Sequence, residues 1–441
     1  MEEDPLGEKQ VPEEALYGVQ TARALENFRI SRLRIHPGLI AAIAEIKKAA
    51  AETNVLTGSL EPELGEAIAR AAREVAEGRW SDQFCLDVFQ AGAGTSYNMN
   101  VNEVVANRAL EILGCRRGDH DRLSPNDHVN KSQSTNDVMP TAMRVAAVRL
   151  LRGLTGALDR LAESFAAKAG EFKEVRKSGR THLHDAVEMT LGQEFAAWGH
   201  SVQRAAERLR STEPHLLEVH LGGTAVGTGL NAKPEYREGV VARLAGIAGL
   251  QLKEAPDPVQ STQSLGDFVA VSGALRGVAV ELSKIANDLR LLNSGPHTGL
   301  DEIELPALQP GSSIMPGKVN PAVAEMVNMV CFHVAGHDAA IAMAGEAGQL
   351  ELNVMMPYVA YALLEGLDVM TSAVRTFDED CVRRIKAHED RCREYAERSV
   401  GQAARLNEKL GFLGAARVAG RAVDTGRSVP EVLEEEEVAK G

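Results

Sequence analysis

The sequence is poor in aromatic residues: Phe, Trp and Tyr make up 4% of its 441 residues. Ala, Leu, Val, Glu and Arg are abundant instead. Strands prefer aromatic and β-branched side chains, whereas most of the abundant residues here are good helix formers. The composition therefore favours a mainly α fold, and the chain is long enough for a large core and more than one domain.

Cysteine is scarce, and its spacing does not suggest pairing. The chain has an odd number of cysteines, no two of which form a CxxC pair, namely Cys85, Cys115, Cys331, Cys381 and Cys392. A chain of this length with so few cysteines is not a disulfide scaffold. We therefore expect free, mostly buried thiols in a reducing cytoplasm.

The chain also lacks long apolar runs and an excess of positive charge. No uncharged run reaches the roughly 20 residues of a membrane span, and the acidic start MEEDPLGEKQ does not resemble a signal peptide. The formal net charge is −14, whereas nucleic acid or an anionic membrane would require a basic face. We expect a cytoplasmic protein with no nucleic-acid or membrane partner.

Motifs for common cofactors are missing as well. The sequence has neither a GxGxxG after a predicted strand nor a GxxxxGK[ST], so it predicts no dinucleotide or ATP site. His182 and His184 could suit a metal site on a strand, but no cysteine set or HExxH accompanies them. Ser312 has no GxSxG setting. We expect neither a cofactor nor a metal.

Long apolar heptad seams are the clearest pattern that is present. Between Leu265 and Leu292 the apolar residues alternate in steps of four and three, which predicts a long helix packed along one seam. The residues of this seam are Val271, Leu275, Val278, Leu282, Ile285, Leu289 and Leu292. The helix should end at NSGP, because glycine and proline commonly follow a helix C-terminus.

Two further long helices are predicted. One follows Pro140, with a seam made by Ala147, Leu151, Leu154, Leu158, Leu161 and Phe165. The other extends from about Val323 to Gly345 and is apolar almost all round, so it requires neighbours on several sides. Together these helices predict a long central bundle. Its apolar surfaces would pack against sister subunits, and a monomeric bundle is the alternative.

Composition along the chain suggests three domains. Residues 1–135 would form an N-terminal domain of shorter helices, and residues 136–385 the central bundle of long helices. Residues 386–441 are highly charged and end in EVLEEEEVAKG, which predicts a small helical domain with a solvated acidic tail.

Four polar stretches interrupt the helical pattern. They are GAGTSYNMNVNE (92–103), NKSQSTNDVMPT (130–141), SGRTHLHDAVEMTLGQEF (178–195) and GSSIMPGKVNP (311–321). Each has an ordinary structural explanation, since Ser, Thr, Asn and Asp cap helices and Gly/Pro segments form surface turns. As a set, however, they offer hydroxyls, amides and backbone N–H groups with only a few cations. This chemistry suits the binding of carboxylates and of a developing oxyanion.

These stretches resemble the aspartase/fumarase superfamily, whose hallmark is a GSSxMPxKxN loop like residues 311–320. The resemblance extends from GEKQVPEEALYGVQTARALENF through GGTAVGTGLN, KIANDLRLLNSGP and EAGQLELNVMMP to TGRSVPEV. It implies a three-domain subunit that assembles into a homotetramer through its long helices, with composite active sites built from three subunits. It also implies a β-elimination that releases fumarate, alone or within a larger product.

The resemblance also implies residue roles. Ser312 would be the general base that takes a proton from the substrate β-carbon, and backbone N–H groups with Lys318 could stabilise its alkoxide. The positions that match contacts to the β-carboxylate, as an aci-carboxylate, are Thr95, Ser134, Thr135 and Ser313. Lys318 and Asn320 match positions that hold the α-carboxylate. The positions near the leaving group are Asn136, Thr181 and His182, the last being an acid in some members.

The motifs also bear on which branch of the superfamily the chain resembles. GTSYNMN and NKSQSTND are closer to aspartases, which release ammonia from L-aspartate, whereas PNDHVN and MPGKVNP are closer to fumarases. The sequence predicts an ammonia-lyase, with a class II fumarate hydratase or a catalytically silent helical scaffold as alternatives. Tyr97, His184 and Glu188 depart from the family pattern. Glu188 could alter substrate preference near Thr181 and His182, or simply face solvent.

Overall fold

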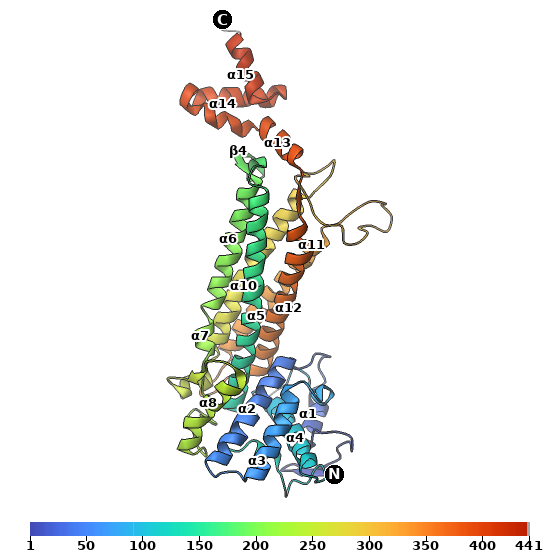
Figure 1. Cartoon of the computed structure of the whole chain (residues 1–441), viewed down its shortest axis with the longest axis vertical. Coiled ribbons are helices and arrows are strands. Elements are labelled where there is room, and N and C mark those ends of the chain that lie inside the picture. The colour runs from blue at the N-terminus through green and yellow to red at the C-terminus, as the bar shows by residue number, and fades with distance from the viewer. Residues whose placement is uncertain (91, 439–441) are drawn as a thin grey trace. The chain divides into compact units, whose positions relative to one another are not determined.

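The computed structural model describes residues 1–90 and 92–438, and helices dominate them (Figure 1). The helices are α1 (Val19–Asn27), α2 (Pro37–Leu56), α3 (Pro62–Ala76), α4 (Thr95–Ile112), α5 (Thr135–Glu171), α6 (Leu191–Arg210), α7 (Glu213–Leu216), α8 (Pro234–Ala248), α9 (Pro258–Gln263), α10 (Gly266–Leu292), α11 (Ala322–Glu346), α12 (Met356–Asp380), α13 (Glu389–Arg398), α14 (Asn407–Thr425) and α15 (Val429–Val438). Short 3₁₀ or π segments lie at Ser81–Gln83, Pro125–Val129, Val382–Arg384 and Val400–Leu406. The predicted mainly α fold is confirmed.

The strands of the described residues form only small two-stranded sheets. They pair as β1 (Glu2–Asp4) with β2 (Gly7–Lys9), β3 (Arg176–Thr181) with β4 (His184–Thr190), β5 (Glu218–Val219) with β6 (Lys253–Glu254), and β7 (Ile303–Glu304) with β8 (Lys386–Ala387). Three of these pairs are antiparallel, and β5 with β6 is parallel.

The chain forms two compact units, each of which is discontinuous in sequence. The first contains residues 1–154, 208–277 and 333–370, and the second contains residues 155–207, 278–332 and the chain from Thr371. The division into domains at 1–135, 136–385 and 386–441 stays a prediction. The acidic run predicted as a tail enters α15, and residues 439–441 lie outside the described residues.

In the first unit, α2, α3 and α4 pack side by side (Figure 1). Apolar residues of α2 such as Ile43 and Ile46 are fully buried. Glu103 on α4 caps the N-terminus of α1, because its carboxyl group accepts hydrogen bonds from the backbone N–H groups of Gly18, Gln20 and Thr21.

The start of α5 differs from the prediction. The helix was expected after Pro140, but it begins at Thr135 and contains this proline. Proline has no N–H, so the carbonyl of Asn136 loses its usual partner within the helix. The Nε2 atom of His220 lies 3.2 Å from that oxygen and replaces the missing donor. A distant histidine therefore allows the helix to begin earlier than the proline suggests.

The predicted seams are confirmed. Every seam residue of α5 and α10 is buried, with Leu292 the most exposed at 5%. Helix α10 ends at Leu292 and α11 covers Ala322–Glu346, close to the predicted bounds. Helices α6 and α12, which are also long, were not singled out from the sequence.

In the second unit, an aromatic cluster joins α5, α6 and α12. The ring centroid of Phe165 lies 6.0 Å from Phe195, 6.1 Å from Trp198 and 6.3 Å from Phe377. These four rings are almost fully buried, and pairs with such offsets stabilise a core beyond their area alone. These four aromatic residues thus lie where three long helices meet.

The C-terminal part of this unit is helical, as expected. A separate apolar cluster holds it together and consists of Ala403, Val418, Ala422, Val429 and Val432.

The five cysteines are free, and Cys331, Cys381 and Cys392 are buried. No helix within the described residues has the length and hydropathy that crossing a bilayer requires.

Candidate active site

The loop at residues 311–320 closes on itself. The N–H of Gly311 donates to the carbonyl of Lys318 at 2.8 Å, and the Asn320 side-chain amide donates to the Gly311 carbonyl at 2.7 Å. A Cβ atom at Gly311 would lie 2.5 Å from the Lys318 oxygen, so only glycine permits this approach. Gly317 has φ +83°, a conformation that glycine adopts without strain.

This closed loop directs two donors at one hydroxyl. The Oγ atom of Ser312 accepts hydrogen bonds from the N–H groups of Ile314 at 3.2 Å and Met315 at 3.0 Å. Two N–H donors favour the charged form of an oxygen over its neutral form. The arrangement can therefore stabilise an alkoxide on Ser312.

The remaining polar groups of the loop stay available to a ligand. Lys318 is exposed, and its Nζ atom donates to the Asn320 Oδ1 atom at 2.7 Å. Ser313 is exposed beside Ser312. A cation, an amide and a hydroxyl thus share one short segment, which is the chemistry that a carboxylate requires.

Thr181 and His182 lie at the tip of the β3–β4 hairpin. Thr181 pairs with His184, which leaves a turn of two residues, His182 and Leu183, with φ of 56° and 61°. Positive φ at both positions suits the twist of a hairpin, but non-glycine residues adopt it at a cost of roughly 1–3 kcal/mol each. Among the described residues of the second unit, no hydrogen bond joins Thr181 or His182 to the 311–320 loop.

A buried charge network holds the base of this hairpin. Glu302 is fully buried, and its carboxylate lies 2.9 Å from Arg180 and 3.0 Å from Lys177. Lys177 also lies 2.6 Å from Glu194 on α6. This network could not be predicted, because nothing in the local sequence of Glu302 identifies its partners more than a hundred residues away.

Ser134 caps the N-terminus of α5, which is the ordinary structural role expected of the polar residues in the stretch 130–141. Its Oγ atom accepts from the N–H of Asn136 at 3.2 Å, and its own N–H donates to Asp137 at 2.9 Å. Together these two hydrogen bonds satisfy N–H groups at the start of the helix, much as a capping box does. Asp137 also accepts from the N–H groups of Gly222 and Thr224, so it ties the GGTAVGTGLN segment to the helix start. Burial raises the pKa of Asp137 to about 6.

Lys47 organises the polar groups next to this helix start. It is fully buried on α2, and its Nζ atom donates to the side-chain oxygens of Asn98, Asn130 and Gln133 at 2.7, 3.1 and 2.9 Å. Asn98 in turn donates to the Thr135 hydroxyl at 3.3 Å. Burial lowers the pKa of Lys47 to about 7, while the three amide oxygens favour its charged form. The sequence signal for this buried charge is a lysine inside the alanine-rich run AIAEIKKAAAE, which was not among the predicted site residues.

Thr95 and Asn136 complete the predicted set in the first unit. Thr95 begins α4, is exposed, and donates through its hydroxyl to the Gly92 carbonyl at 2.6 Å. The amide of Asn136 donates to the carbonyl of Ala225 at 2.8 Å. The Asn98 side chain of α4 links α4 to the start of α5, where Ser134, Thr135 and Asn136 lie.

The three departures from the family pattern have separate explanations. Tyr97 is buried and its hydroxyl donates to the carbonyl of Asp87 at 3.3 Å, so it is part of the core. His184 is exposed at the start of β4. Glu188 receives two hydrogen bonds from Arg176, at 2.9 and 2.8 Å, which lower the pKa of its carboxyl. The extra carboxylate is therefore paired within the hairpin.

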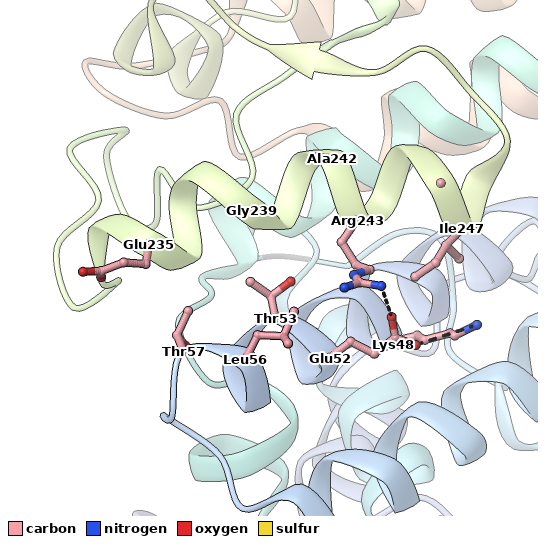
Figure 2. A pocket seen from close by; sticks show the side chains of 11 residues that line it. Lys48, Glu52, Thr53, Leu56, Thr57, Glu235, Gly239, Ala242, Arg243 and Ile247 are labelled. Atoms are coloured by element: carbon pink, nitrogen blue, oxygen red, sulfur yellow. Dashed lines mark ion pairs between the residues drawn. The ribbon is translucent and has the colours of Figure 1, made fainter.

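A pocket of about 890 Å³ between α2 and α8 does not include the predicted site residues (Figure 2). Leu56, Gly239, Ala242 and Ile247 form much of its wall. Its cations are already balanced, because Glu52 lies 3.6 Å from Arg243 and 4.0 Å from Lys48. A small dicarboxylate would find little uncompensated positive charge there.

Comparison with known proteins identifies the class to which the chain belongs. A family described as lyase matches residues 7–336, so the chain belongs to this lyase family. The predicted membership of the aspartase/fumarase superfamily is confirmed, and with it the prediction of a lyase.

Individual relatives cover nearly the whole chain. An aspartate ammonia-lyase of Bacillus subtilis is 50% identical over 99% of this chain and 94% of its own length. A crystal structure of fumarate lyase:delta crystallin from Brucella melitensis bound to cobalt has a TM-score of 0.95 and 47% identity, over 99% of this chain and 95% of that one. A class II fumarase from Schistosoma mansoni also has a TM-score of 0.95, with 36% identity and the same coverage.

Replacing Lys47 with Met should destabilise the protein and reduce its activity. Three amide oxygens would lose their donor, at a cost on the order of 2–4 kcal/mol in the free energy of unfolding, and Asn98 would no longer be held against Thr135. Lys48→Met is the matched control, because Lys48 is partly exposed and its ion pair with Glu52, at 4.0 Å, is long and therefore weak. Urea denaturation and turnover of the two variants test this, and equal effects would contradict the assigned role.

His220 should make stability depend on pH. Burial lowers its pKa to about 4, whereas an unfolded histidine titrates near pH 6.5. Between these values the unfolded chain binds a proton that the folded chain excludes, so the free energy of unfolding falls as pH decreases. The contribution amounts to at most about 3 kcal/mol.

The variant His220→Gln isolates this effect, since an amide can still donate to Asn136 but does not titrate. We expect a shallower loss of stability between pH 7 and pH 4.5 in urea denaturation. Asp137, whose pKa is raised, acts in the opposite direction but is present in both proteins. Identical pH dependence of the two proteins would show that His220 does not contribute.

Proposed function

We propose that this chain catalyses the reversible elimination of ammonia from L-aspartate to give fumarate, with Ser312 as the general base. The observation that carries the proposal is the pair of N–H groups, from Ile314 and Met315, directed at the Ser312 Oγ atom. A neutral serine is too weak a base for a carbon acid. Preorganised donors lower the free energy of its alkoxide and so make proton abstraction feasible.

The reaction then proceeds in two steps. The Ser312 alkoxide takes a proton from Cβ, and the released electron pair moves into the β-carboxylate to form an aci-carboxylate. This pair then returns to form the carbon–carbon double bond while the C–N bond breaks and its electrons leave with nitrogen. The products are fumarate and ammonia, and the proton on Ser312 passes to solvent.

Two groups of side chains would hold the substrate. Thr95, Ser134, Thr135 and Ser313 are proposed to donate hydrogen bonds to the aci-carboxylate, where negative charge increases most. Lys318 and Asn320 would hold the α-carboxylate, and their mutual 2.7 Å contact places a cation and an amide together for this purpose. Asn136, Thr181 and His182 would lie near the amino group.

The nature of the leaving group supports ammonia. A substrate ammonium departs as neutral ammonia without receiving a proton, whereas the hydroxyl of malate requires an acid to leave as water. Within the described part of the single chain, no hydrogen bond holds the His182 ring in the way that such an acid would require. The 50% identity to an aspartate ammonia-lyase, against 36% to a class II fumarase, agrees with this choice.

We further propose a cytoplasmic homotetramer with composite active sites. Apolar side chains on α10 and α11 of the second unit are unusually exposed in the single chain, namely Val280, Leu291, Met329 and Phe332 at 62%, 41%, 63% and 64%. Val280 and Leu291 are eleven residues apart, which places them on one helix face. Surfaces of this kind mark subunit interfaces.

A direct assay tests the activity. Purified protein with L-aspartate should increase the ultraviolet absorbance of fumarate, whereas L-malate should give far less. Product from malate alone would favour the hydratase, and product from neither substrate would favour the scaffold.

Ser312→Ala should lower kcat by about 10²–10⁴-fold, the usual contribution of a general base, while the oligomer stays intact. Ser211→Ala is the control, because Ser211 is exposed and its hydroxyl only donates to the Arg208 carbonyl. Near-normal turnover by Ser312→Ala would show that another group is the base.

Phe332→Glu should weaken the tetramer, because it places a charge in an apolar interface. Sedimentation equilibrium should show tetramers for the unmodified chain and smaller species for this variant. Val423→Glu, at an exposed apolar position on α14, should leave the mass unchanged. A monomeric unmodified chain, or a fully tetrameric Phe332→Glu, would contradict the proposed assembly.

A further inference from the structure

Two histidines and a glutamate to which the proposed mechanism assigns no role lie together in the first unit. His333 and His337 are one turn apart on α11, and Glu365 faces them from α12. One ligand atom from each side chain can be chosen so that all three lie within 4.8 Å of one another. The His333 Nε2 atom lies 2.8 Å from the Glu365 Oε2 atom, and the two imidazole centroids are 4.1 Å apart.

We propose that His333, His337 and Glu365 bind a divalent transition-metal ion such as Zn²⁺ and thereby clamp α11 to α12. Two imidazoles and one carboxylate are a common set of three protein ligands for zinc, with water in the remaining position. Nitrogen ligands favour zinc, cobalt, nickel and copper over magnesium and calcium.

The geometry needs only modest adjustment to hold such an ion. Metal–ligand bonds of about 2.0–2.2 Å in a tetrahedral site separate the ligand atoms by roughly 3.3 Å. The distances between ligand atoms in the structure lie on both sides of this value: His333 Nε2 and Glu365 Oε2 are 2.8 Å apart, and no two of the three ligand atoms are more than 4.8 Å apart. The side chains are 42%, 17% and 30% exposed for His333, His337 and Glu365, so they have room to rotate.

The ring of His337 is held against the neighbouring helix. The Nδ1 atom of His337 lies 3.1 Å from the carbonyl oxygen of Ala362. The same Nδ1 atom lies 3.5 Å from the Glu365 Oε2 atom, so it is the ring nitrogen that faces the carboxylate of the proposed site, while the Ala362 carbonyl helps to fix the orientation of the ring.

Neighbouring charges add to the attraction for a cation. Asp368 follows Glu365 by three residues on α12. Its carboxylate is directed towards His36, with the Oδ2 atom 3.8 Å from the His36 Nε2 atom. His36 itself accepts from the N–H of Gly38 through Nδ1, so its proton is on Nε2 and it is not a further ligand. The site therefore combines one ligating carboxylate with a second acidic group nearby.

Titration with Co²⁺ tests the proposal, because its visible absorption intensifies when ligands surround it tetrahedrally. Full-length, tag-free protein that has been treated with a chelator should bind about one Co²⁺ per chain, and Zn²⁺ but not Mg²⁺ should displace it. His333→Gln and His337→Gln should each weaken binding at least tenfold. His200→Gln, which removes an exposed histidine from α6, is the matched control and should bind normally.

Thermal unfolding provides a second measurement that does not depend on the visible spectrum. Zn²⁺ should raise the unfolding midpoint of the unmodified chain and of His200→Gln, but not that of the double variant His333→Gln/His337→Gln. The double variant should unfold cooperatively without metal, which shows that it is folded. Absence of stoichiometric binding, one ion per two or four chains, or unchanged binding by the folded double variant would overturn the proposal.

Discussion

A serine hydroxyl can act as a base toward carbon only if its alkoxide is stabilised before the substrate reacts. In this protein the donors are backbone N–H groups, those of Ile314 and Met315, and the loop that supplies them has no helix or strand to hold it. Its shape depends instead on Gly311, which lets the chain approach Lys318 closely, and on the Asn320 amide. The glycines and the asparagine of the motif are thus required by geometry, and the serine and lysine by chemistry.

The other half of the proposed carboxylate site depends on buried charges that are not among the residues proposed to bind the substrate. Asp137 ties the start of α5 to the segment around Gly222, and Lys47 holds the amides next to Thr135. Buried charges are expensive unless hydrogen bonds satisfy them. In return, such networks hold hydroxyl groups in one orientation, which a flexible surface loop would not do.

Much of the fold could be predicted, because heptad seams determine which faces of α5 and α10 are apolar and because α11 is apolar almost all round. The sequence did not reveal that α5 begins before Pro140, since the compensating donor is His220, which lies eighty-four residues from Asn136. For the same reason the pairing of Arg180 with Glu302 was missed. The residues of the candidate site came from motifs, but the two N–H groups at Ser312 are backbone geometry, which residue identities do not encode directly.

In the proposed mechanism the Ser312 oxygen removes the β-proton of the substrate while the N–H groups of the loop hold this oxygen in place. The most direct test is a crystal structure of the assembled protein with a non-reactive analogue of L-aspartate, from which the distance between Ser312 Oγ and the analogue's Cβ is measured. With Ser312 as the base, this distance should be roughly 3–3.5 Å, and Oγ should still accept hydrogen bonds from the N–H groups of Ile314 and Met315. An Oγ atom far from Cβ, with a different side chain in its place, would contradict it.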